Sequence, residues 1–334
     1  MTVKVSINGF GRIGRGFMRA ASGYKDFEIV AINDLADEKT NAYLLKYDTV
    51  SGKFDGTVDY GDGFIKVNGR EIKVYRERDP EKLPWKELGV DLAIECTGLF
   101  RTEETAGKHI TAGAKKVVLS APGKGGDILT IVPGVNDRHY DPERHKIISN
   151  ASCTTNCLAP MVKVLDEAFG INSGLMTTIH AVTNDQRMLD VVHSDLRRAR
   201  AGCWNIIPTT TGAAKAISQV YPPAAGKLTG MAVRVPVMDV SLVDLNVTLT
   251  KAVTSEEVNA AFKAASEGDL KEYVEYIDEP LVSSDFIGND HSCIFDSIAT
   301  LTIGNMAKVL GWYDNEGGYS QRLADLTAIV AKSL

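Results

Sequence analysis

The segment VKVSINGFGRIG, residues 3–14, joins a short apolar run to a cluster of glycines. The apolar run at 3–7 predicts a buried strand, and residues 12–21 have the pattern of a helix. A second apolar run at 27–33 predicts another strand. Strand, glycine-rich turn, helix and strand in this order form a βαβ unit, so the fold is expected to begin as a parallel sheet.

The rest of the chain shows two patterns. Up to about residue 150, short apolar strands alternate with turns or helices, which favours an α/β domain with a doubly wound parallel sheet. The predicted elements there are strands at 90–95, 116–120 and 146–149 and a helix at 102–112. After Cys153 longer strands favour an α+β domain with a mainly antiparallel sheet and helices on one face. Its predicted elements are strands at 174–180, 231–236 and 241–249 and helices at 212–220 and 255–267.

The glycines after the first strand predict a dinucleotide site. Gly9 permits a tight turn, Gly11 lets the backbone approach a pyrophosphate, and Gly14 lets the helix pack on the strand. The backbone N–H groups of Arg12 and Ile13 would then face the phosphates, supported by the helix dipole. A purely structural turn is the alternative.

Asp34 favours the cofactor interpretation and selects NAD. It follows the second strand and lies 20 residues after Gly14. A carboxylate there accepts hydrogen bonds from both ribose hydroxyls and repels a 2′-phosphate, so NAD is expected over NADP.

The segment ASCTTNC, residues 151–157, places a thiol at a predicted helix start. Ser152 is a natural N-cap for a helix over 153–169, and Cys153 would meet its dipole and unpaired N–H groups, which favour thiolate. His180, in the segment Thr178-Ile179-His180, is the candidate partner. Cys157, one turn on, is expected to be a packing residue. Without further information Cys153 could also be a small buried hydrophobe and His180 a packing residue.

Composition excludes several classes of protein. The 334 residues are 44% hydrophobic, enough for two packed domains, and the net charge of −6 argues against nucleic acid or an anionic membrane as partner. Five scattered cysteines fit reduced thiols, and the histidines and cysteines form no metal-ligand spacing. No leader peptide or membrane-spanning run is present, so we expect a cytoplasmic protein.

The segment at 151–157 resembles the active-site signature of phosphorylating glyceraldehyde-3-phosphate dehydrogenases of the bacterial glycolytic type. The similarity runs from Val3 to Leu326. The resemblance implies a Rossmann-type NAD-binding domain at 1–150, a catalytic and substrate domain at 151–316, and a C-terminal helix within 317–334 that returns to the first domain. It also implies NAD-dependent oxidative phosphorylation of D-glyceraldehyde 3-phosphate to 1,3-bisphosphoglycerate by a homotetramer. The loop at 181–208 would pack between its subunits.

The resemblance also assigns roles to individual residues. For the cofactor these are Arg78 and Phe100 near adenine, Thr97 and Ser120 along the molecule, Asn315 at the nicotinamide carboxamide and Tyr319 near the ring. For the sugar's phosphate they are Thr183, Arg198 and Arg234. For inorganic phosphate they are Ser152, Thr211, Gly212 and again Arg198, and Thr154 joins the substrate-binding set. From the residues alone, 209–212 is either a capped helix start or an anion site, and Arg197, Arg198 and Arg200 form either a solvated face or a phosphate cluster.

The implied mechanism uses Cys153 as nucleophile toward the aldehyde and His180 as general base, through a thioester that phosphate cleaves. Erythrose-4-phosphate dehydrogenase, which hydrolyses its thioester, is one alternative. A non-catalytic NAD-binding surface or adhesion protein is the other, and the pair of Cys153 and His180 argues against it.

Two positions depart from the family pattern. Val191-Val192 replaces a Leu-Pro pair, so NAD specificity would rest mainly on Asp34. Gly317 replaces a large aromatic residue, from which we predict a segment that is mobile without the cofactor.

Overall fold

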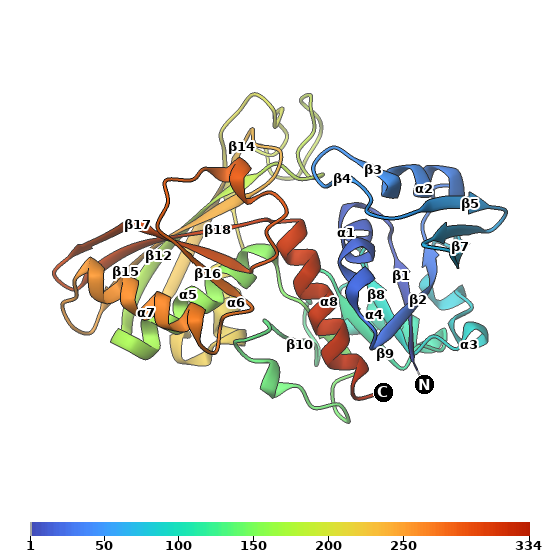
Figure 1. The fold of residues 1–334 in the computed structure, drawn as a ribbon, viewed down its shortest axis with the longest axis horizontal. Coiled ribbons are helices and arrows are strands. Elements are labelled where there is room, and N and C mark those ends of the chain that lie inside the picture. The colour runs from blue at the N-terminus through green and yellow to red at the C-terminus, as the bar shows by residue number, and fades with distance from the viewer. Residues whose placement is uncertain (1) are drawn as a thin grey trace. The chain divides into compact units, whose positions relative to one another are not determined.

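The computed structural model of the protein describes residues 2–334. The chain divides into two compact units. One extends up to Ile131 and adds Arg138–Ala151 and Ser320–Leu334, and the other comprises Val132–Asp137 and Ser152–Tyr319. Figure 1 shows the elements of each unit.

The first unit is built on a nine-stranded sheet in the order β10-β11-β9-β8-β1-β2-β7-β6-β5. Its strands are β1 (Val3–Asn8), β2 (Phe27–Asn33), β5 (Val58–Gly61), β6 (Phe64–Val67), β7 (Arg70–Tyr75), β8 (Leu92–Glu95), β9 (Lys116–Leu119), β10 (Leu129–Thr130) and β11 (Ile147–Ser149). From β10 to β7 every neighbouring pair is parallel, which confirms the predicted parallel sheet. The sequence analysis missed the antiparallel edge formed by β5, β6 and β7.

The helices of this unit lie between its strands in the sequence, except for the C-terminal helix. They are α1 (Arg12–Ala20), α2 (Glu38–Lys46), α3 (Trp85–Leu88), α4 (Glu103–Thr111) and most of α8 (Gly317–Ala331), with short 3-10 turns η1 (Ala21–Gly23), η2 (Pro80–Lys82) and η3 (Asp137–His139). A two-stranded ribbon joins β3 (Tyr47–Asp48) and β4 (Gly52–Lys53). Because β1, β8 and β9 are covered on both faces, their residues are almost all buried. The carboxyl ends of the parallel strands form the edge at which ligands of such sheets bind.

The second unit has a seven-stranded sheet in the order β13-β14-β12-β15-β18-β17-β16. Its strands are β12 (Ile171–Ala181), β13 (Ile207–Thr210), β14 (Leu228–Val235), β15 (Ser241–Leu249), β16 (Val274–Ile277), β17 (Cys293–Ile303) and β18 (Met306–Tyr313). Four of the six neighbouring pairs are antiparallel, which confirms the predicted mainly antiparallel sheet. Burial alternates along β15, so one face of that strand is packed.

Helices cover one face of this sheet. They are α5 (Cys153–Phe169), α6 (Ala213–Val220) and α7 (Ser255–Glu267), with 3-10 turns η4 (Pro222–Ala224) and η5 (Ser283–Phe286). The central helix α5 contacts both other helices and four strands, and Figure 1 shows the three helices together on the same side of the strands. Side chains on the strands, including Leu175, Met231 and Met306, remain exposed.

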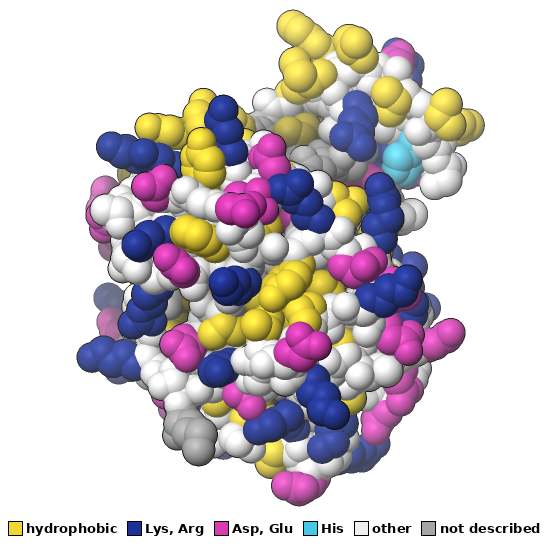
Figure 2. Space-filling view, turned by 90° about the vertical axis from the view of Figure 1, so that its right-hand side faces the viewer, with side chains coloured by type: hydrophobic (Ala, Val, Ile, Leu, Met, Phe, Trp, Pro, Cys, Tyr) yellow, Lys and Arg dark blue, Asp and Glu magenta, His cyan; other side chains and the backbone are white. Residues whose placement is uncertain are grey.

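The molecular surface carries mixed charge. Figure 2 shows Lys and Arg side chains interspersed with Asp and Glu over the face that it draws. Within residues 2–334, no helix has the length and apolar character required to cross a bilayer.

Candidate active site

Cys153 is the first residue of α5, and local backbone geometry places it there. The Ser152 side chain accepts a hydrogen bond from the Thr155 N–H at 3.1 Å, which confirms Ser152 as the N-cap. Ala151, immediately before, has a φ of +56°, a left-handed conformation that costs a non-glycine residue about 1–2 kcal/mol. Strained backbone of this kind is common where a functional side chain has to be aimed.

His180 lies near the end of β12, and its ring meets the thiol. The distance from Cys153 Sγ to His180 Nε2 is 3.5 Å. On the neighbouring parallel strand β14, the register places Arg234 opposite His180. The sheet therefore brings a base and a cation to the start of α5, although the thiol and the imidazole are 27 positions apart in the sequence.

The His180 Nδ1 atom has two neighbours that make opposite demands. It lies 2.7 Å from the Ala181 carbonyl oxygen, which can only accept, and 2.5 Å from Arg234 Nη1, which can only donate. Arg234 Nη1 has another acceptor in the same carbonyl, at 3.0 Å. The Ala181 carbonyl oxygen can therefore accept from both a protonated Nδ1 and Arg234 Nη1. With the proton on Nδ1, the Nε2 lone pair is directed at Cys153. This is the tautomer that a general base requires.

Electrostatics set the resting protonation of the pair. Burial lowers the pKa of His180 to about 3, and Arg234 adds to the shift, so the imidazole is neutral at pH 7. Burial raises the pKa of the Cys153 thiol, against the opposing effects of the Arg234 guanidinium and the Thr154 backbone N–H. The position of Cys153 at the helix start predicted only the stabilisation of thiolate, because burial of the thiol is not visible in the sequence. Cys153 nevertheless keeps part of its surface exposed, which leaves the sulfur accessible to a substrate.

Tyr313, which was not predicted from the sequence, supports Cys153 and His180 through contacts with their neighbours and with the His180 ring. Its hydroxyl lies 2.9 Å from Thr154 Oγ1 and 2.8 Å from Thr178 Oγ1, and its ring meets the His180 ring edge-on at 6.0 Å. Burial raises the pKa of Tyr313, so it stays a neutral phenol. Tyr313, on β18, thus connects α5 and β12 at the site. The Thr154 hydroxyl is engaged in this hydrogen bond.

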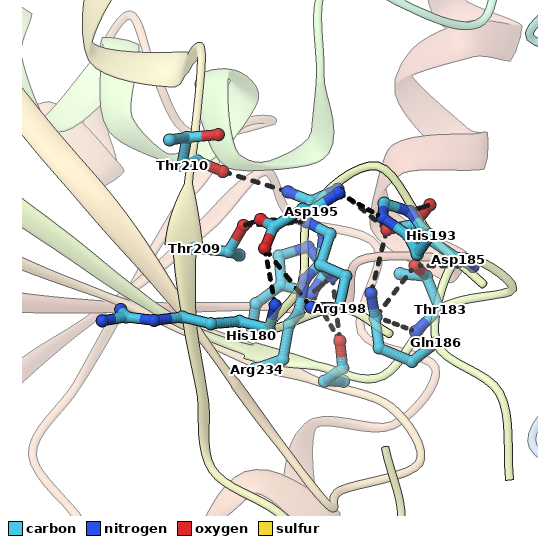
Figure 3. Close-up of polar contacts among 12 residues, drawn as sticks. His180, Thr183, Asp185, Gln186, His193, Asp195, Arg198, Thr209, Thr210 and Arg234 are labelled. Carbon is cyan, nitrogen blue, oxygen red and sulfur yellow. Dashed lines mark hydrogen bonds and ion pairs between the residues drawn. The ribbon is translucent and has the colours of Figure 1, made fainter. Parts of the chain in front are cut away.

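Arg198 is anchored by several acceptors (Figure 3). Its Nη1 donates to Asp185 Oδ2 at 2.8 Å, its Nε donates to Thr209 Oγ1 at 2.8 Å, and its Nη2 donates to the Thr210 carbonyl at 3.1 Å. Asp195 lies 3.6 Å away and accepts from the Thr209 hydroxyl. The charge of Arg198 also contributes to the lowered pKa of His180, so this cation acts on the pair formed by Cys153 and His180.

The other candidate phosphate ligands lie on two short segments. Thr183 donates from its N–H and its hydroxyl to Gln186 Oε1, at 3.1 and 3.3 Å. The Thr211 hydroxyl accepts from the Ala213 N–H at 3.2 Å, while Gly212 is the exposed N-cap of α6. Thr211 therefore satisfies one N–H of the first turn of α6, and the anion-binding role of this helix start stays a prediction.

Asn315 is oriented by a chain of hydrogen bonds. The Ser241 hydroxyl accepts from the Ala181 N–H at 3.1 Å, and it donates to Asn315 Oδ1 at 2.6 Å. Because Ser241 takes the carbonyl oxygen of this buried amide, the amide nitrogen is the group that Asn315 would present to a carboxamide.

The glycine-rich turn of the first unit has the backbone that the motif requires. Gly9 has a φ of +92°, and a Cβ added there would lie 2.7 Å from the Thr97 backbone nitrogen. A Cβ on Gly14 would lie 2.2 Å from the Gly9 carbonyl oxygen, whereas Gly11 faces open space. Gly9 and Gly14 thus permit close packing, and Gly11 leaves room for a ligand against the turn. Arg12 forms an ion pair with Asp48 at 2.5 Å.

Asp34 follows β2 and is partly exposed. Its Oδ2 accepts from the Phe10 N–H at 2.8 Å and its Oδ1 from the Ala36 N–H at 3.0 Å. Since a carboxylate offers about four lone-pair sites, Asp34 retains capacity for two ribose hydroxyls. The turn and this carboxylate therefore fit the adenosine half of NAD.

The remaining cofactor candidates differ in exposure. Arg78 is exposed, whereas Thr97, Phe100 and Ser120 are intermediate and Tyr319 is buried. The Thr97 hydroxyl donates to Glu95 and accepts from the Leu99 N–H, so it is engaged within the protein. Within residues 2–334, no cluster of three or more His, Cys, Asp or Glu residues is placed to hold a metal ion.

Comparison with known proteins adds independent information. The family model described as the NAD binding domain of glyceraldehyde 3-phosphate dehydrogenase matches residues 3–103, and the model of its C-terminal domain matches residues 152–315. The chain belongs to the glyceraldehyde-3-phosphate dehydrogenase family. It is therefore an NAD-dependent oxidoreductase of that family.

Curated members of the glyceraldehyde-3-phosphate dehydrogenase family resemble the chain over its whole length. The chain is 59% identical over 332 residues to the enzyme of Geobacillus stearothermophilus, covering 99% of both chains. It is 57% identical over 336 residues to glyceraldehyde-3-phosphate dehydrogenase 2 of Streptomyces avermitilis, covering 100% of both. It is 56% identical over 333 residues to glyceraldehyde-3-phosphate dehydrogenase 1 of Bacillus subtilis, covering 99% of both.

Gly317, which the sequence analysis singled out, contacts the residues immediately before it. It is the first residue of α8, its φ is not positive, and its N–H donates to Asp314 Oδ1 at 2.6 Å. A Cβ there would lie 2.8 Å from Asp314 Oδ2. The close approach of the Asp314 carboxylate is a reason for glycine at this position, and mobility of this segment without the cofactor stays a prediction.

Proposed function

We propose that the chain converts D-glyceraldehyde 3-phosphate, NAD and inorganic phosphate to 1,3-bisphosphoglycerate and NADH in glycolysis, with Cys153 as nucleophile and His180 as base. The 3.5 Å contact between Cys153 Sγ and His180 Nε2 carries this assignment. NAD, when bound, supplies the hydride acceptor. The turn from Gly9 to Gly14 and Asp34 would hold its adenosine half, and Asn315 would hold its carboxamide.

The first half of the reaction forms a bond to sulfur. His180 Nε2 takes the thiol proton as Cys153 Sγ attacks the aldehyde carbon, and the proton then moves to the new oxyanion to give a thiohemiacetal. Backbone N–H groups at the start of α5 stabilise the oxyanion before it is protonated. His180 next removes the hydroxyl proton while the carbon loses a hydride, which leaves a thioester on Cys153.

The second half of the reaction requires two anion sites. Inorganic phosphate attacks the thioester carbon, the carbon–sulfur bond breaks, and the acyl phosphate leaves with Cys153 restored. Arg198, Arg234 and Thr183 would bind the phosphate of the sugar. Ser152, Thr211, Gly212 and Arg198 would serve inorganic phosphate. Thr154 would belong to the substrate-binding set, although Tyr313 already engages its hydroxyl.

The same proposal includes a cytoplasmic homotetramer. The segment from Ala181 to Pro208 would pack between subunits, and it exposes an unusual number of apolar side chains for a loop. These are Met188, Leu189, Val191, Val192, Leu196, Trp204 and Ile206. Exposed apolar groups gathered on one loop are typical of a protein interface. Light scattering should report about four subunits per particle, and a fully active monomer would contradict the assembly.

The deciding experiment is NADH formation with glyceraldehyde 3-phosphate, measured with and without inorganic phosphate. We expect sustained turnover only with phosphate. Sustained turnover without phosphate, or a preference for erythrose 4-phosphate, would favour a dehydrogenase that hydrolyses its thioester. An absence of turnover with either sugar, in protein that binds NAD, would favour a non-catalytic role.

A further inference from the structure

A buried carboxylate, Glu95, lies behind the glycine-rich turn of the first unit. It is the last residue of β8 and is 1% exposed. Two donors reach Oε2: Asn8 Nδ2 at 2.6 Å and His109 Nε2 at 3.1 Å. Two more reach Oε1: the Thr97 N–H at 2.7 Å and the Thr97 hydroxyl. The four lone-pair sites of the carboxylate therefore face four donors.

Trp85 fixes the ring that supports this carboxylate. Its indole N–H, which can only donate, lies 3.0 Å from His109 Nδ1. Nδ1 must therefore accept, so the proton of neutral His109 resides on Nε2 and points at Glu95. Trp85 and His109 are both 0% exposed, which leaves solvent no access to change this arrangement. Trp85 thus donates to His109, and His109 donates to Glu95, in one chain of hydrogen bonds.

The chain of hydrogen bonds ends on the segments that line the proposed cofactor site. Asn8 precedes Gly9, and Thr97 is the residue whose backbone nitrogen would lie 2.7 Å from a Cβ on Gly9. Glu95 therefore holds both sides of the close approach between Gly9 and Thr97. Asn8 Oδ1 in turn accepts from Asn33 Nδ2 at 2.7 Å, and Asn33 precedes Asp34.

Asn33 extends the connection to a fourth strand end. Its Nδ2 donates to the Glu77 carbonyl and its Oδ1 accepts from the Glu77 N–H, each at 2.8 Å. Glu77 precedes Arg78, the candidate neighbour of adenine. One network of buried side chains thus connects the carboxyl ends of β1, β2, β7 and β8, where a doubly wound sheet binds its ligand.

We propose that Glu95, oriented by Trp85 and His109, is a positioning residue for NAD: it sets the spacing between the glycine-rich turn and the Thr97 segment. This inference rests on the proposed cofactor site. The Glu95 carboxylate is out of reach of solvent and has no direct contact with the cofactor in this account. It acts through Asn8 and Thr97, so its loss should change NAD binding without changing the chemistry at Cys153.

The test measures NAD affinity by calorimetry on the full-length protein well below its unfolding temperature. Glu95→Gln places an amide NH2 among donors, and the unmatched groups should weaken NAD binding by roughly tenfold. Trp85→Phe keeps an aromatic ring but releases His109 Nδ1, and it should weaken NAD binding by a smaller factor. In both variants KM for NAD should rise while kcat at saturating NAD stays within about twofold of wild type.

The matched control is Val90→Ala, which opens a cavity in the same buried cluster as Trp85 without touching the polar chain. It should lower the unfolding temperature as Trp85→Phe does and leave the dissociation constant for NAD unchanged. Nitrogen-15 NMR of the His109 ring gives a second measurement that needs no cofactor. Wild type should show the proton on Nε2, and Trp85→Phe should lose that preference.

The outcomes separate this proposal from the cofactor site itself. If Asp34→Gly weakens NAD binding but folded Glu95→Gln does not, the site stands and the positioning role is rejected. If neither changes the affinity, the cofactor site is wrong. If Val90→Ala weakens NAD binding as much as Trp85→Phe, the network is only structural. Should Glu95→Gln fail to fold, Trp85→Phe and the His109 tautomer decide alone.

Discussion

Two buried histidines, His109 in the first unit and His180 in the second, show how partners decide the use of the same side chain. Both rings are at most 4% exposed. The Nε2–H of His109 donates to a carboxylate and its Nδ1 accepts from an indole, so both nitrogens are occupied. His180 Nε2 instead faces a thiol at 3.5 Å, beside an arginine. Burial alone therefore does not distinguish the two histidines. The Nε2 atom that His180 directs at the thiol does, and it is the basis of the proposed catalytic role.

The sharpest contrast between these sites comes from removing the reactive partner. Cys153→Ser should reduce turnover by several orders of magnitude, because a hydroxyl is a far weaker nucleophile toward the aldehyde. NAD affinity should stay close to wild type, since the adenosine half binds elsewhere. Steady-state kinetics and NAD titration check this prediction, and wild-type turnover in Cys153→Ser would remove the basis of the assignment.

His180→Asn should lower turnover by about 10²–10⁴-fold, the range typical of a lost general base. It should also raise the apparent pKa of Cys153 further, because no imidazole is left to take the thiol proton and then donate Nε2–H to the thiolate. Rates of alkylation measured against pH should therefore rise at higher pH than in wild type. Because the resting imidazole of the wild-type protein is neutral, we expect its alkylation rate to show no plateau of high reactivity at low pH. Identical pH profiles for both proteins would show that the two residues are not coupled.

His109→Gln, in contrast to His180→Asn, should lower the unfolding free energy and leave kcat nearly unchanged. Losing a fully satisfied buried donor and acceptor should cost about 1–3 kcal/mol of unfolding free energy. Because Gln can still donate to Glu95, kcat at saturating substrates should change by less than about threefold. Denaturant unfolding and kinetics on the same sample check both parts. A loss of kcat as large as that of His180→Asn would break the comparison between the two histidines.

Asp34→Gly should weaken NAD binding and narrow the preference for NAD over NADP, by a few kcal/mol at most. The carboxylate both accepts from the ribose hydroxyls and repels a 2′-phosphate in this account. The ratio of kcat/KM values for the two cofactors is the measurement. A fixed ratio would move recognition elsewhere, for example to the loop that carries Val191 and Val192.

Asp239 is another buried carboxyl, and we expect it to affect the pH dependence of stability and not turnover. Burial and then the neighbouring Asp314 raise its pKa to about 8, so Asp239 keeps its proton in the folded state at pH 7. Its stabilising contribution is full below about pH 4 and is lost as the pH rises toward 8, at up to about 1.4 kcal/mol per pH unit. Asp239→Asn should flatten the pH dependence of unfolding free energy in that window. An unchanged slope would place the shift on another group.

The sequence predicted the structural features that depend on residues close together in the chain. The βαβ start, the cap at Ser152 and helix α5 follow from local propensity and spacing, and the glycine-rich turn is contiguous. Bonds between distant residues gave no such signal: Tyr313 meets Thr154 across 159 positions, and Asn8 meets Glu95 across 87. The antiparallel strands β5, β6 and β7 were missed for another reason, since each is short and only partly buried.

The most direct test of the central claim is a single-turnover experiment without phosphate. Wild-type protein mixed with NAD and glyceraldehyde 3-phosphate should release about one NADH per subunit and then stop. Intact-protein and peptide mass spectrometry should then find a phosphoglyceryl group on Cys153, and added phosphate should remove it and restart turnover. Continued NADH release without phosphate, or an acyl group on any other residue, would contradict a Cys153 thioester that phosphate cleaves.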